Sequence, residues 1–208
     1  MTTPTTTIEG KKKYHHGDLR EQLLEAVRQL VETHGADRFS VSEASRLAGV
    51  SSAAPYKHFK DRHDILRGVS LLAMMRLRAS MQVAADAYPA KDPHRIAALG
   101  QSYVDFAKSE PGIFRMMFGQ TEGHAEDPDL ARAGDETNAL VEQVVAEHLD
   151  AEPDDPEVKL RAYALWCFVH GHSFLCLDSK LPGEMSAVDE GALLQLIGGA
   201  MLPPRDRP

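Results

Sequence analysis

The chain has 208 residues, of which 43% are apolar and 26% charged, a composition typical of a globular protein with one or two small domains. No run approaches the roughly 18 apolar residues of a membrane span. The N-terminal lysines precede a polar stretch, which argues against a secretory signal. We therefore expect a cytoplasmic protein in which Cys167 and Cys176, nine residues apart, are reduced and unpaired.

The charge is unevenly distributed along the chain. The net charge is −8 overall, which argues against a nucleic-acid binder at first sight. However, residues 1–68 hold eleven Lys and Arg against nine Asp and Glu, together with five of the ten histidines, whereas residues 69–208 hold twelve against twenty-two. A basic end on an acidic body is expected where only one end meets phosphate groups.

Residues 1–13 are rich in threonine and are predicted to form a disordered basic arm that ends in Lys11, Lys12 and Lys13. With His15 and His16, these lysines could reach into a DNA minor groove. A solvated leader without a partner fits the same residues.

The rest of the chain is predicted to be all-α, with about nine helices and no strand. The first helix is expected to begin near Asp18, with Glu21 as a capping partner, and to end at Gly35. The second should begin at Ser40, with Val41, Ala44, Leu47 and Ala48 facing inward, and Ser51 should cap a short third helix. A long fourth helix should begin at Asp61 and run towards Tyr88. Further helices are expected around residues 96–106, from Pro111, around 140–148, from Pro156, and over 187–202.

Residues Ser40–Phe59 have the spacing of a helix-turn-helix. Gly49 stands where the chain must turn sharply and leave the right-handed helical region, and Val50 is an apolar plug in this turn. The small side chains of Ala44 and Ala48 allow two helices to cross closely. Because a generic helical hairpin would show the same pattern, the flanking residues have to decide.

Those flanking residues favour a nucleic-acid contact. Ser51 and Ser52 stand at the start of the third helix, where free backbone N–H groups point outward. Side chains suited to phosphate follow at once: Tyr56, Lys57, His58, Lys60 and Arg62. A solvated charged face is the alternative, but it would have to coincide with the turn geometry.

Two stretches resemble a known family. YHHGDLREQLLEAVRQLVETHG (residues 14–35) and FSVSEASRLAGVSSAAPYKHFKDRHDIL (residues 39–66) look like the N-terminal domain of TetR-family transcriptional regulators. The run from Trp166 to Gly171 matches the Trp-x-x-x-His-Gly motif of one branch. The resemblance implies a helix-turn-helix domain over residues 14–62 and a helical effector-binding and dimerisation domain over residues 63–208.

The family's DNA contacts carry over by position. Ser40 and Ser42 correspond to backbone and base contacts, and Ser51, Ser52, Ala53 and Ala54 form the groove-facing start of the recognition helix. Tyr56, Lys57 and His58 correspond to backbone clamps, and Lys60 and Arg62 to contacts at the start of the fourth helix. The sequence departs from the family at Ala53, Ala54 and Pro55, since an alanine can touch only a thymine methyl group.

The resemblance also implies a homodimer through the last two helices and a pocket for a small, apolar effector in the body. Met and aromatic side chains suit such a pocket, although core packing explains any one of them equally well. The candidates are Met74, Tyr103, Phe106, Phe114, Met117, Phe118, Trp166, His170 and Phe174. We expect no cofactor and no metal, because His170 and His172 are two residues apart and do not share a helix face.

These features favour a ligand-responsive repressor of a palindromic operator. A sequence-independent architectural DNA-binding protein is the main alternative, which the acidic body disfavours. An enzyme is a third reading, but the sequence has no glycine-rich phosphate loop, no HExxH motif and no nucleophile–base pair.

Overall fold

The computed structural model describes residues 16–119, 127–183 and 189–203, and within these ranges every regular element is helical. The expected all-α fold is confirmed, with eight α-helices and one short 3₁₀ helix in the described residues. In chain order these are α1 (His16–His34), α2 (Val41–Leu47), η1 (Pro55–Lys57), α3 (Arg62–Asp86), α4 (His94–Ser109), α5 (Pro111–Phe118), α6 (Pro128–Leu149), α7 (Pro156–Leu177) and α8 (Glu190–Met201). The basic arm predicted for residues 1–13 lies outside the described residues.

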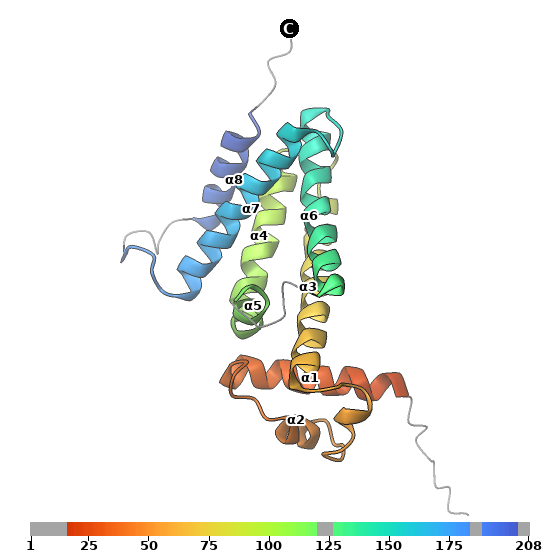
Figure 1. The fold of residues 1–208 in the computed structure, drawn as a ribbon. Coiled ribbons are helices and arrows are strands. Elements are labelled where there is room, and N and C mark those ends of the chain that lie inside the picture. Colours follow the sequence, from red (N-terminus) through yellow and green to blue (C-terminus); the bar gives the residue numbers. More distant parts are fainter. Residues whose placement is uncertain (1–15, 120–126, 184–188, 204–208) are drawn as a thin grey trace, which may run out of the picture.

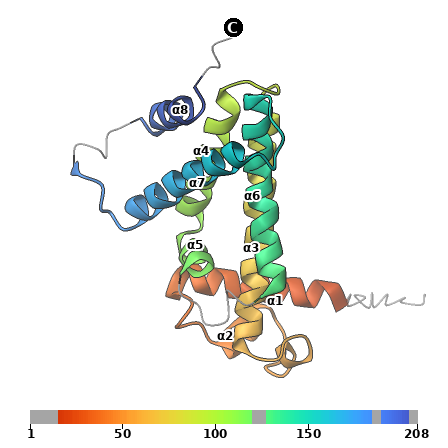
Figure 2. The same ribbon diagram turned by 45° about the horizontal axis from the view of Figure 1, so that its top comes forward.

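The molecule consists of a small head and a larger body, joined by α3 (Figure 1). The head holds α1, α2 and η1 at the bottom of the view, and α3 rises from it into the body. In the body, α3 packs on α4 and α6, and α4 packs in turn on α7 and α8. Figure 2 confirms that α8 lies on the side of α4 away from α3 and α6.

The helix starts and stops in the head follow mostly from local chemistry. The Ser40 hydroxyl accepts a hydrogen bond from the Glu43 N–H (3.5 Å) and so caps α2, as expected. Gly49 has φ +69°, a left-handed conformation that costs a glycine little and other residues more. The start of α1 differs from the prediction, because its helix begins at His16 and Asp18 lies inside it rather than at its N-cap.

The predicted third helix is wrong in its geometry. Residues between Ser51 and Phe59 form successive tight turns that include η1, and no α-helix. Pro55 has no N–H to donate to the Ser51 carbonyl, and the Ala54 N–H donates to that carbonyl instead, at 3.0 Å. A bond between residues three apart winds the chain more tightly than an α-helix does.

The side chain of Leu47 also differs from the prediction. It is 52% exposed rather than facing inward. Ala44, by contrast, is fully buried, as expected. The inward face of α2 is therefore narrower than its apolar pattern predicts.

Helix α7 is apolar on all sides, but a single chain covers only one of them. Val158, Ala162 and Leu165 are buried in the core. On the other side, Leu160 is 68% and Tyr163 59% exposed. Within the described residues, no helix combines the length and the apolar character that a bilayer crossing would need.

Candidate DNA-binding surface and ligand cavity

The expected DNA contacts form an exposed polar surface on the head. We call it the head surface, and eight of its residues are exposed: Ser40, Ser42, Ser51, Ser52, Ala53, Tyr56, Lys57 and Lys60. Ala54 and His58 are half-buried. Buried Pro55 and Phe59 anchor this segment from beneath, and the Arg20 guanidinium lies 5.2 Å above the Phe59 ring. The head surface thus rests on apolar anchors that fix its shape.

Arg62 behaves differently from the other predicted contacts. Its guanidinium donates a hydrogen bond to the Ala36 carbonyl and lies 4.6 Å above the Phe39 ring. These contacts join the first turn of α3 to the loop between α1 and α2. Because its guanidinium contacts groups inside the head, Arg62 stabilises the head structurally. We call this its brace role and leave Arg62 out of the head surface.

The body contains an apolar cavity of about 340 Å³ between helices α3 to α8, and exposed residues such as Tyr163 and Trp166 stand on its wall. Four of the nine predicted pocket residues line it: Met74, Tyr103, Phe118 and Trp166. Phe106, Phe114 and Met117 are packed in the core, while His170 and Phe174 lie behind the wall in an aromatic cluster with Phe114. The sequence reasoning missed several lining residues, among them Leu99, Thr137, Asn138, Val141, Tyr163 and Ile197.

The hydroxyl group of Tyr103, which lines the cavity, contacts His170 behind the wall. The Tyr103 hydroxyl oxygen lies 2.8 Å from His170 Nδ1. Burial raises the pKa of Tyr103 and lowers the pKa of His170, so both rings are uncharged at neutral pH. The rest of the wall is mostly apolar, with a few polar side chains that include Asp135, Thr137 and Asn138, and such a lining suits an apolar ligand.

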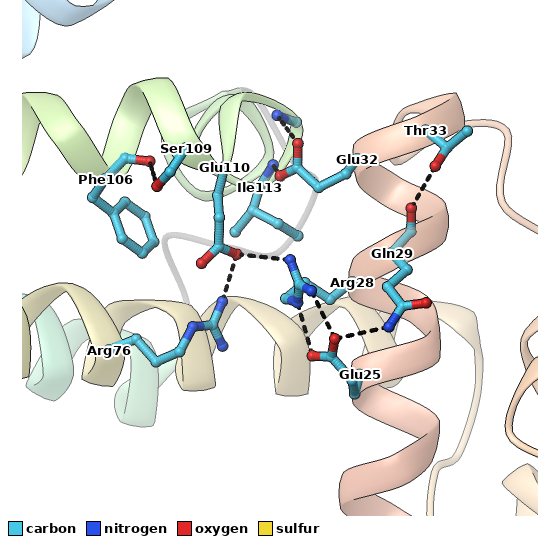
Figure 3. Close-up of polar contacts among 11 residues, drawn as sticks. Glu25, Arg28, Gln29, Glu32, Thr33, Arg76, Phe106, Ser109, Glu110 and Ile113 are labelled. Carbon is cyan, nitrogen blue, oxygen red and sulfur yellow. Dashed lines mark hydrogen bonds and ion pairs between the residues drawn. The ribbon is translucent and has the colours of Figure 1, made fainter.

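Helix α5 connects this cavity to the head. Its last residue, Phe118, lines the cavity, whereas its first turn lies against α1. There the Glu32 carboxylate accepts hydrogen bonds from the N–H groups of Gly112 (3.0 Å) and Ile113 (2.8 Å) (Figure 3). A Cβ atom at Gly112 would lie 2.8 Å from the Val31 carbonyl oxygen, so only glycine allows this approach of the two backbones.

An ion-pair network surrounds the junction between α4 and α5 (Figure 3). The Glu110 carboxylate lies 2.7 Å from the Arg76 guanidinium and 3.5 Å from that of Arg28. Glu25 holds Arg28 in turn through two hydrogen bonds of 2.6 and 2.7 Å, and these bonds lower the pKa of Glu25. The network, which we call the polar joint, ties α1, α3 and the start of α5 together.

A small head with a turn-linked pair of short elements, set on a helical body, is an architecture of DNA-binding transcriptional regulators. Residues 96–197 match the family model of the tetracyclin repressor-like C-terminal domain. This match covers just under half of the chain and shows that its body is similar to the C-terminal domain of the TetR family of transcriptional regulators. The branch indicated by Trp166 and His170 stays a prediction.

One relative and two solved structures are similar to this chain. The nucleoid occlusion factor SlmA of Vibrio cholerae is 29% identical over 139 residues, which cover 66% of each chain, so the match spans just under two thirds of that relative. A structure of a protein of unknown function from Rhodococcus sp. RHA1 has a TM-score of 0.77 and 27% identity, over 92% of this chain and 97% of that one. The regulator FadR of Bacillus subtilis, solved with stearoyl-CoA, shares the fold at a TM-score of 0.68 and 12% identity, over 88% and 98% of the two chains.

The brace role of Arg62 predicts a stability effect. In Arg62→Met, the Ala36 carbonyl loses its donor and the Phe39 ring its cation, so the free energy of unfolding should fall by about 1–3 kcal/mol. Lys57→Met, at an exposed position, should change it by less than about 0.5 kcal/mol. Urea denaturation measures both values. If the two variants are equally stable, Arg62 does not stabilise the head in this way.

The lowered pKa of His170 predicts a pH dependence of stability. Below about pH 6.5 the unfolded chain binds a proton at this residue while the folded chain does not, so this contribution to stability is lost as the pH falls further. Unfolding free energies measured between about pH 7.5 and 5 should therefore fall more steeply for the wild type than for His170→Asn. Tyr103→Phe should keep the steep fall, because burial, and not the contact with Tyr103, lowers the pKa of His170. Identical slopes for the wild type and His170→Asn would contradict the assignment of the pH dependence to His170.

Proposed function

We propose that this protein is a repressor that binds a palindromic operator as a homodimer and leaves it when a small apolar effector fills the cavity. The observation that carries the proposal is α5, which contacts the cavity through Phe118 and the DNA-binding head through Gly112. We further propose a division into a DNA-binding domain over residues 14–62 and an effector domain over residues 63–208, in a protein that acts without catalysis in the cytoplasm.

The head surface supports contact with the DNA backbone more than contact with bases. Tyr56, Lys57 and Lys60 are exposed on one segment and carry donors suited to phosphate oxygens. Ser52 and Ala53, also exposed, offer one hydroxyl and one methyl group to a groove. Such contacts place the protein on the duplex, while few of them read its sequence.

The uncovered side of α7 supports the dimer. Leu160, Tyr163 and Trp166 are 39–68% exposed there, and Leu196 on the neighbouring α8 is 67% exposed. A single chain rarely leaves so many large apolar side chains in water on adjacent helices. A second copy packed on this side would cover them and place two heads for two half-sites.

The cavity supports an apolar effector. FadR, a structural relative, was solved with stearoyl-CoA, and a long acyl chain is one ligand class that such a wall accepts. A ligand that pushes Phe118 outward would tilt α5, whose other end is fixed to α1 by Glu32. The two heads would then change their spacing, which favours the free state over the DNA-bound state.

The DNA-binding part of the proposal is tested by salt-dependent affinity. Against a palindromic site selected from random DNA, Lys57→Met and Lys60→Met should each weaken binding and reduce the slope of log K against log salt by about one per lost contact, hence about two per dimer. Fluorescence anisotropy at several salt concentrations measures this.

Lys91→Met serves as the control, because it removes the same charge from the junction between α3 and α4, far from the head. It should leave the slope unchanged. A steep slope without preference over scrambled DNA would instead favour the sequence-independent architectural alternative.

The effector part is tested by filling the cavity. Val141 lies half-buried on its wall, so Val141→Trp should abolish binding of a neutral naphthylamine dye that is fluorescent in apolar surroundings. Val83→Trp, at a position 72% exposed on α3, is the matched control and should bind the dye like the wild type. Unchanged dye binding by Val141→Trp would place the effector elsewhere.

A further inference from the structure

Three different metal-ligating side chains meet where α7 ends and α8 begins. His172 and Cys176 are four residues apart on α7 and therefore lie on the same face of the helix. Glu190 is the first residue of α8. His172 Nε2 lies 3.1 Å from a Glu190 carboxylate oxygen and 3.5 Å from Cys176 Sγ, and one ligand atom from each residue lies within 4.8 Å of the other two.

Two of the three separations, those from His172 to Glu190 and to Cys176, are close to the edges of a tetrahedral metal site. Zinc bonds of about 2.0–2.1 Å to nitrogen or oxygen and about 2.3 Å to sulfur place the ligand atoms of a tetrahedron roughly 3.3–3.6 Å apart. The two separations given for this cluster, 3.1 and 3.5 Å, need only small side-chain adjustments to meet that geometry. The His172 and Glu190 side chains are 11% and 19% exposed, so the cluster is sheltered but open to an ion from solvent.

The surroundings of Glu190 also resemble an outer shell of a metal site. Its carboxylate accepts hydrogen bonds from Gln101 (2.8 Å) and from Lys108 (2.7 and 2.8 Å). Such bonds orient a carboxylate ligand. The Lys108 ammonium competes with a cation for the same oxygens, but this side chain is 46% exposed and can turn into water.

We propose that His172, Cys176 and Glu190 bind one zinc-type divalent ion per chain, with a solvent molecule in the fourth position. A thiolate, an imidazole and a carboxylate form the mixed set that zinc accepts and that magnesium or calcium does not. The ion would clamp the first turn of α8 to the last turns of α7. Sequence reasoning paired His172 with His170, whereas the partner that shares its helix face is Cys176.

Cobalt titration of the full-length reduced protein tests the proposal, because Co²⁺ occupies zinc sites and reports thiolate ligation by a charge-transfer band. The wild type should show this band, saturate at one Co²⁺ per chain, lose the signal when Zn²⁺ is added, and unfold at a higher temperature with Zn²⁺. Cys176→Ser should lose the band. Cys167→Ser, which removes the other, exposed cysteine, should keep it.

Two further variants separate a metal site from a mere hydrogen-bonded cluster. His172→Ala should weaken Zn²⁺ binding at least tenfold, and Lys108→Met should strengthen it, because the competing ammonium is gone. Circular dichroism verifies that each variant is folded, and Cys176→Ala replaces Cys176→Ser if the latter is not. The proposal is overturned by substoichiometric binding, by a charge-transfer band that survives in folded Cys176 variants, or by equal Zn²⁺ affinity of the wild type and His172→Ala.

Discussion

The connection of head and body depends on the ion pairs that the Glu110 carboxylate forms with Arg28 and Arg76. This carboxylate stands between Arg76 of α3 and Arg28 of α1, and it is only 17% exposed. Without it, the guanidinium groups of Arg28 and Arg76 would face each other, with Glu25 and the more distant Glu32 left to balance them. The carboxylate also belongs to the residue at which α4 ends and α5 begins, so one charged group sets the position of four helices.

Because α5 is short, a displacement at one of its ends is transmitted to the other end. A helix of eight residues is about 12 Å long, and one of its ends is held to α1 by Glu32 while the other borders the cavity. Because packed interiors do not compress, a ligand that moves Phe118 has to rotate the helix or repack its neighbours. The close backbone approach at Gly112 passes such a rotation on to α1 without a flexible side chain between them.

The sequence predicts the parts of the fold that local chemistry decides. The structure has helix caps at Ser40 and Asp61, as predicted, since a capping side chain needs only residues two or three positions away. The tight turns after Ser51 were predicted as a helix, although Pro55, which has no N–H to donate, pointed to the difference. The exposure of Leu47 could not be foreseen, because it depends on where α1 and α3 leave α2 uncovered.

The candidate sites were harder to predict than the helices. An apolar residue that lines a cavity and one that packs in the core follow the same helical pattern, so Phe114 and Tyr103 look equivalent in the sequence. Only the packing of α4 against α6, α7 and α8 separates them. The same holds for Arg62, whose charge suggests a phosphate contact until Ala36 and Phe39 are found beside it.

In the proposed DNA complex, the poor base-reading chemistry of the head would give the body a larger role in choosing DNA. When side chains such as Ala53 read few base edges, discrimination rests on the shape and deformability of the duplex and on the spacing of the two half-sites. In the proposed dimer, that spacing would be set by how two copies pack through α7 and α8. The residues that decide where the protein binds would then include Leu160, Tyr163 and Leu196, far from the DNA, and anything that shifts α8 against α7 would change the operator that is recognised.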